Sequence, residues 1–196
     1  MTTWPLTTER LALRPFEADD FDAVWSYRSR PDVDQWLGGT RDREDVRKRF
    51  AEPADGTTQL VVLHRGEIVG DLMLRIEDAW AQRDVAEHAK ATLGVLGWTM
   101  HPDAGGRGLA TEAVRELLRH AFDDLGLRRV IAECFADNEP SWRLMERIGM
   151  RREAHHVLDS LHRTRGWQDE YVYALLADEW RDRQAAPNVD ASITKR

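Results

Sequence analysis

The feature that most constrains the fold is a glycine-rich turn, Gly-Gly-Arg-Gly, at residues 105–108, which lies between two strongly patterned segments. The apolar run at residues 91–100 comes before the turn and stops at Pro102, which indicates a strand. After the turn, apolar residues recur every three to four positions from Leu109 to Leu125, which predicts a long amphipathic helix that ends at Gly126. A strand and a helix joined in this way favour a mixed α/β fold.

The rest of the chain predicts further elements of the same domain. We expect strands at 11–15, 59–63, 68–74, 129–135, 155–158 and 170–176, and helices at 21–28, 42–50 and 142–148. The second and third of these strands form a hairpin, because a turn with a glycine joins them. The 196 residues contain no internal repeat or low-complexity linker, so we predict one domain over residues 1–180 and a flexible polar tail at 181–196.

Charge and cysteine content exclude several classes of protein. The formal net charge of −7 argues against a general attraction to nucleic acid or to an anionic membrane, although a local basic pocket is compatible with it. Cys134 is the only cysteine, so neither an internal disulfide nor a cysteine-based zinc site can form. The longest run without Asp, Glu, Lys or Arg, residues 91–102, is too short to span a bilayer, and the first residues resemble no secretory signal. We therefore expect a cytoplasmic protein without a metal.

The turn at residues 105–108 has the chemistry of an anion site. The first N–H groups of a helix lack partners within it and lie at the positive end of its dipole, and glycines let an anion approach the backbone closely. Such a turn can hold a pyrophosphate, although an ordinary loop before a helix explains it equally well. A dinucleotide fingerprint would need glycine where Thr111 stands, and the chain has no Gly-Lys-Ser/Thr run of a nucleoside triphosphate loop.

A second motif changes this balance. The strand at 129–135 is followed by Asn138, Ser141 and a helix that ends in Gly149 and an apolar residue. The two motifs together resemble the GNAT superfamily of acyl-CoA-dependent N-acyltransferases, in particular its RimJ/RimL-like branch. The turn is similar to that family's Gln/Arg-x-x-Gly-x-Gly/Ala loop, with Gly108 and Ala110 in register. The resemblance covers nearly the whole chain, and it implies a mixed, mostly antiparallel central sheet flanked by helices, with strands splayed at the acyl-CoA cleft.

The resemblance also implies which residues bind coenzyme A (CoA). Main-chain N–H groups from Gly106 to Thr111 would bind the pyrophosphate, and the strand that leads into the turn would pair with the pantetheine arm as an added strand. Gly97 fits the point where this strand bulges and leaves its neighbour. The implied cofactor-binding residues are Trp98, Met100, Gly105, Gly106, Arg107, Gly108, Leu109, Ala110, Thr111, Asn138 and Ser141. Arg107 is equally explained as a solvated arginine.

Two departures from the family pattern leave the general acid and the general base of the reaction unidentified. Met145 stands where many relatives have a tyrosine acid, and Val95 stands where many have a glutamate. Ser141, or a water that it orients, is therefore the candidate proton donor, with helix capping as the alternative. Carboxylates near strands that could face the cleft, each also explained as a solvated or paired group, are Glu133, Asp71 and Asp169. Tryptophans that belong to the core or line an acceptor pocket are Trp25, Trp36, Trp80 and Trp167.

The resemblance implies an enzyme that moves an acetyl group, or a longer acyl group, from CoA to a primary amine by direct attack. The acceptor could be a protein N-terminus or a small molecule, and the sequence leaves a homodimer open. A non-catalytic acyl-CoA-binding module is the alternative, which Met145 and Val95 favour. A nucleotide-binding oxidoreductase is a third reading, and it fits poorly because no second strand–helix–strand unit follows the turn.

Overall fold

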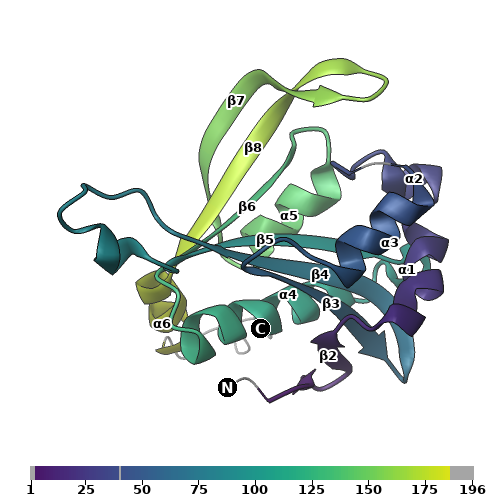
Figure 1. The fold of residues 1–196 in the computed structure, drawn as a ribbon, viewed down its shortest axis with the longest axis horizontal. Helices are drawn as coiled ribbons and strands as arrows, with labels where there is room; N and C mark the ends of the chain where they lie inside the picture. The colour runs from purple at the N-terminus through teal and green to yellow at the C-terminus, as the bar shows by residue number, and fades with distance from the viewer. Residues whose placement is uncertain (1–2, 40, 186–196) are drawn as a thin grey trace, which may run out of the picture.

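The computed structural model describes residues 3–39 and 41–185, and the strands among them form one eight-stranded sheet (Figure 1). The strand order is β1-β2-β3-β4-β5-β6-β8-β7, and every neighbouring pair is antiparallel except β5 and β6. The strands are β1 (Leu6–Thr7), β2 (Leu11–Pro15), β3 (Thr57–His64), β4 (Glu67–Glu77), β5 (Leu93–Met100), β6 (Arg129–Phe135), β7 (Arg151–His162) and β8 (Gly166–Leu176). The expected mixed, mostly antiparallel sheet is confirmed.

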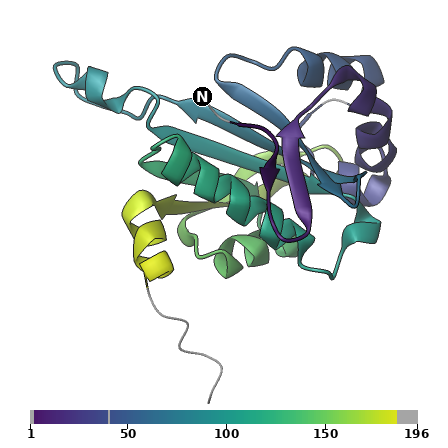
Figure 2. The ribbon, with the colours of Figure 1, turned by 90° about the horizontal axis from the view of Figure 1, so that it is seen from below.

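Helices pack on both faces of this sheet (Figures 1 and 2). The α-helices are α1 (Phe21–Arg28), α2 (Pro31–Asp34), α3 (Arg43–Ala51), α4 (Leu109–Arg119), α5 (Glu139–Arg147) and α6 (Ala177–Ala185). The apolar stripe of α4 is buried with residues of α5 and α6 in the larger core. A smaller core on the other face joins α1 and α3 to β3. Alternate side chains of the central strands therefore point to different helical layers.

The strands β5 and β6 splay apart, as the family resemblance implied. They pair at three positions only, the last being Val95 with Ile131, although β5 continues to Met100 and β6 to Phe135. Beyond that point β6 pairs with β8, whereas β5 stays paired with β4. The expected bulge at Gly97 is wrong, because Gly97 lies opposite Met73 in an unbroken register with β4. We refer to the gap between β5 and β6 beyond Val95 and Ile131 as the wedge. It opens where β6 turns toward β8, while β5 keeps its regular pairing with β4.

The C-terminal third of the chain is more regular than its sequence pattern indicates. The strands β7 and β8 extend well beyond the expected residues 155–158 and 170–176 and form a long hairpin (Figure 1). The helix α6 reaches Ala185, so residues 181–185 of the expected tail are helical; the rest of that tail, residues 186–196, lies outside the described residues. Trp180 anchors α6, since its side chain is buried against Phe122. Within the described part of the chain, no helix is long and apolar enough to cross a membrane.

Candidate active site

The turn before α4 presents a row of free N–H groups. Gly106 and Gly108 adopt φ angles of 72° and 74°, a left-handed conformation that favours glycine, and Gly108 is the N-cap of α4. Within the described residues, the main-chain N–H groups from Gly106 to Thr111 donate no hydrogen bond; the first to do so is that of Glu112, to the Gly108 carbonyl. A Cβ atom on Gly106 would meet nothing within 4 Å, so the space above the turn is open. These features are those of an anion-binding cradle.

A groove of about 1680 Å³ runs from this cradle along α4 and α5. Seven of the residues expected to bind CoA line it: Met100, Gly105, Gly106, Gly108, Leu109, Ala110 and Thr111. Arg107 does not line the groove; its guanidinium donates to the Asp103 carbonyl at 3.2 Å, and its own carbonyl accepts a bond from Arg10. The geometry of Arg107 favours the reading as a surface arginine that stiffens the loop.

The groove also contains arginines that the sequence analysis did not single out. Arg143 and Arg147 of α5 and Arg115 of α4 line it. Arg147 donates to the Thr111 hydroxyl at 3.3 Å, and Arg115 donates to the Arg147 carbonyl at 3.2 Å, so α5 places positive charge beside the cradle. Arg143 and Arg147 are four residues apart, which places them on one face of the helix. This spacing is the sequence pattern from which a basic face beside the turn could have been predicted. Carboxylates line the groove as well, and Arg143 is paired with Glu139, so Arg115 and Arg147 are the cations of these two helices that lie beside the cradle.

The main chain of β5 is unpaired where it borders the wedge. The His101 N–H donates to the Val69 carbonyl on the β4 side, so the N–H groups of alternate residues upstream also point to β4. The main-chain groups of Trp98 and Met100 therefore point the other way, toward β6, which no longer pairs with β5 at that level. This edge can accept an extended ligand as an additional strand.

Asn138 and Ser141 lie where β6 passes into α5. Asn138 occupies the N-cap position, but its side chain makes no capping hydrogen bond and no other bond within the described residues. The Ser141 hydroxyl forms no capping bond either; it shares a hydrogen bond with the thiol of Cys134. Burial raises the pKa of Cys134 to about 11, so the thiol is protonated at neutral pH and is no nucleophile. The Asn138 side chain is therefore free to bind a ligand, whereas the Ser141 hydroxyl already has Cys134 as a partner.

The positions of the missing acid and base are closed to solvent. The Met145 side chain is fully buried and packs in the larger core, and Val95 is buried on the opposite face of the sheet. The hydroxyl of Tyr173 donates to Glu146 at 2.9 Å, and burial together with this carboxylate raises its pKa to about 12. Met145 and Val95 therefore offer the wedge neither a proton donor nor a proton acceptor, and the Tyr173 hydroxyl is already bound to Glu146.

Of the candidate carboxylates, Glu133 is the one left unpaired. Asp71 is buried, accepts the Tyr27 hydroxyl at 2.7 Å and forms an ion pair with Arg28 at 2.7 Å, so the interpretation of a paired group holds for it. Asp169 is paired with His155 at 2.6 Å. Glu133 forms no hydrogen bond or ion pair within the described residues, and partial burial, followed by the charge of Glu170, raises its pKa. Because its neighbours in β6 are buried toward α4, its side chain lies on the opposite face.

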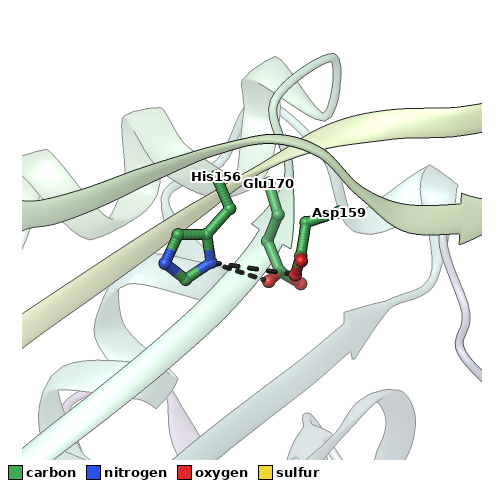
Figure 3. Close-up of side chains that lie close together, drawn as sticks. All are labelled: His156, Asp159 and Glu170. Carbon is green, nitrogen blue, oxygen red and sulfur yellow. Dashed lines mark ion pairs between the residues drawn. The ribbon is translucent and has the colours of Figure 1, made fainter.

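A cluster of His156, Asp159 and Glu170 lies on the β7–β8 hairpin near this face (Figure 3). The His156 Nδ1 atom is 3.9 Å from Asp159 and 3.7 Å from Glu170, and the Ser160 hydroxyl donates to Glu170 at 3.0 Å. The three potential ligand atoms lie within 4.8 Å of one another, but His156 and Asp159 are exposed and are explained by ion pairing. The absence of a metal stays a prediction.

The glycine cradle, the groove and the splayed parallel strands are the features that the resemblance to acyl-CoA-dependent acyltransferases implies. A family model described as "Acetyltransferase (GNAT) domain" matches residues 10–151. The chain therefore belongs to the GNAT family of acetyltransferases.

Relatives and solved structures agree with this assignment. The uncharacterized N-acetyltransferase YnaD of Bacillus subtilis is 32% identical over 179 residues, which cover 89% of this chain and 98% of the relative. A GNAT-family acetyltransferase from Bacillus anthracis has the same fold, with a TM-score of 0.73 and 30% identity over 89% of this chain and 99% of its own. The ribosomal L7/L12 acetyltransferase RimL, solved in complex with coenzyme A, superposes with a TM-score of 0.72 over 89% of this chain and 98% of its own; at 17% identity it shows the fold alone.

Proposed function

We propose that this protein transfers the acetyl group of acetyl-CoA to a primary amine by direct attack of the amine on the thioester. The observation that carries the proposal is the continuity between the free N–H groups of residues 106–111 and the unpaired edge of β5. The pyrophosphate binds the cradle, the arginines of the groove bind the remaining phosphate charge, and the pantetheine arm lies along Trp98 and Met100. The complex of RimL with coenzyme A supports the choice of this donor.

The residues at the wedge supply the groups that acyl transfer needs. The side-chain amide of Asn138 is free to hold a pantetheine amide, and the main-chain N–H of Met100, which faces the unpaired edge of β5, would donate to the thioester oxygen. As the C–N bond forms and the C–S bond breaks, the Ser141 hydroxyl or a water bound to it protonates the departing thiolate. Alignment of the two reactants in the wedge contributes the larger part of the acceleration, roughly 7–11 kcal/mol in favourable cases.

Glu133 is the general base in this proposal. It lies on β6 two residues beyond the last position paired with β5, on the sheet face opposite the CoA groove. An amine that attacks from that face must lose a proton there, and a carboxylate with a raised pKa and no ion-pair partner is suited to accept it.

The proposed function is tested by release of CoA thiol from acetyl-CoA in the presence of a panel of amines, together with equilibrium binding of CoA. Turnover that depends on an amine, with mass-spectrometric detection of the acetylated product, is the expected result. Tight binding of acetyl-CoA without turnover of any amine would instead favour the non-catalytic acyl-CoA-binding module.

We expect Asn138→Ala to weaken CoA binding roughly 2- to 10-fold, because one uncharged hydrogen bond contributes about 0.5–1.5 kcal/mol. Isothermal titration calorimetry measures the effect. The matched control is Asp137→Ala, since the neighbouring carboxylate already accepts a hydrogen bond from Arg165 at 3.0 Å. Equal affinities of the two variants would remove Asn138 from the binding site.

A further inference from the structure

A second cavity, of about 360 Å³, lies between the helices α1, α2 and α3. These helices cover the sheet face opposite α4 (Figure 1), and we refer to the cavity as the helical pocket. Trp25, Leu37 and Val46 give it an apolar wall, and Arg28, Arg41 and Arg49 bring three guanidinium groups to it. A volume of this size is within the usual range for small-molecule sites.

The helical pocket has more arginine side chains than carboxylates to pair with them. Asp71 forms an ion pair with Arg28. Asp34, which is buried, forms ion pairs with both Arg41 at 2.5 Å and Arg163 at 3.3 Å. Arg49 is left over: it forms no hydrogen bond or ion pair within the described residues. Partial burial and the charge of Arg28 lower the pKa of Arg49, as expected for a cation without its own anion. An arginine stays charged in proteins, so a bound anion would relieve this imbalance.

The helical pocket is connected to the strand that borders the wedge. The Arg28 side chain is only 11% exposed, and its guanidinium donates to the Thr99 hydroxyl at 2.9 Å. Thr99 lies between Trp98 and Met100, but its side chain points away from α4. The floor of the helical pocket therefore touches β5 from the face opposite the CoA groove, which is the face from which an acceptor would reach the thioester.

We propose that the helical pocket binds the carboxylate of the acceptor, and that the acceptor is a small amine carrying a carboxylate and an apolar body, in the manner of an amino acid. This inference rests on the proposed function and assigns the substrate class of the same site. Arg49 and Arg28 bind the carboxylate, because the guanidinium fork matches its two oxygens. Trp25, Leu37 and Val46 contact the apolar body, and the amine projects past Thr99 into the wedge.

The experiment compares amines in pairs that differ only by the carboxylate: phenylalanine with 2-phenylethylamine, and 4-aminobutyrate with propylamine. In the unaltered protein we expect kcat/KM to be roughly 10- to 100-fold higher for at least one carboxylate member over its partner, as expected for hydrogen bonds between charged groups. Arg49→Gln should remove that preference, so that kcat/KM of each carboxylate member falls to that of its plain-amine partner. Lys48→Gln is the matched control, since it removes one cation from α3 outside the helical pocket and should keep the preference.

A binding measurement without turnover separates this inference from the proposed function. Phenylalanine is titrated into the protein without CoA, followed by calorimetry, with Arg49→Gln and Lys48→Gln in parallel. Binding that Arg49→Gln weakens roughly tenfold or more, and Lys48→Gln does not, supports the pocket even if no amine is acetylated. Three results would overturn the proposal: equal kcat/KM within both pairs, equal phenylalanine binding by the two variants, or faster acetylation of a peptide N-terminus than of all four small amines. Amine-dependent thiol release in any of these cases would leave the proposed function standing.

Discussion

We expect Gly108→Trp to weaken CoA binding by a factor above roughly 100 and to leave the fold intact. Gly108 lines the groove at the N-cap of α4, so an indole at this position occupies the space in which the pyrophosphate would meet the free N–H groups. The cradle contributes several charge-assisted hydrogen bonds at once, and loss of two of them already exceeds about 2.8 kcal/mol, a factor of 100. Calorimetric titration with CoA measures the loss, and circular dichroism with thermal melting measures the fold.

Backbone strain is the competing explanation for such a loss, and the chain offers a control for it. Gly126 has a φ angle of 69°, nearly the same as that of Gly108, and a Cβ atom there meets nothing within 4 Å. Gly126→Trp therefore carries the same left-handed strain, about 1–2 kcal/mol, at the other end of the helix from the cradle and outside the residues that line the groove. We expect both variants to melt earlier by similar amounts while only Gly108→Trp loses CoA. Unchanged CoA affinity in Gly108→Trp would show that the ligand binds elsewhere.

The parts of the molecule that the sequence predicted well are those with a local cause. The bounds of β6, residues 129–135, match the structure because a run of apolar and β-branched residues ends at a helix cap. The glycines at 106 and 108 have the positive φ angles that the turn requires, and the apolar period after them follows the buried face of α4. Helix α4 ends in a π-helical turn at His120–Asp124, which the period of its apolar residues does not reveal.

Long strands without a buried face escaped this reasoning. The strand β7 is exposed along almost its whole length, so its sequence lacks the alternation by which a half-buried strand is recognised. It forms because β8 supplies its hydrogen-bond partners from Arg151 to His162, and pairing of this kind depends on a segment elsewhere in the chain. The four-residue helix α2 and the helical start of the expected tail were missed for the same reason, because their contacts are tertiary.

The candidate site likewise has a part that could be predicted from local sequence and a part that depends on tertiary packing. The cradle is a property of one turn and one helix end, so it could be read from residues 105–111. The arginines of α5, the pairing of Asp71 with Arg28, and the helical pocket arise when distant segments pack together. The role of Glu133 in particular depends on which face of β6 is covered and on which neighbours are paired, and the spacing of residues along the chain contains neither.

We expect Glu133→Gln to lower kcat/KM for the amine roughly 100- to 10,000-fold, the usual range for loss of a general base, with CoA affinity unchanged. The pH dependence gives the sharper result. The pKa of Glu133 lies above its usual value because of burial and the charge of Glu170, so in the unaltered protein kcat/KM rises as pH increases through that raised pKa and the carboxylate becomes able to accept a proton. The glutamine variant lacks this acidic limb and follows only the deprotonation of the free amine. Thiol release measured from pH 5 to pH 9 tests both statements.

A second variant separates a base from a merely structural carboxylate. Glu170 lies on β8, paired with Phe135 two residues along β6 from Glu133, and Figure 3 shows its carboxylate close to His156 and Asp159. Its negative charge disfavours ionisation of Glu133, so Glu170→Gln lowers the pKa of Glu133 and moves the acidic limb of the profile to lower pH with the maximal rate largely kept. The exposed Glu67, in the β3–β4 hairpin, is the control: Glu67→Gln removes an equal charge and leaves the limb in place. A limb that persists in Glu133→Gln, or one that Glu170→Gln does not move, would assign the deprotonation of the amine to another group.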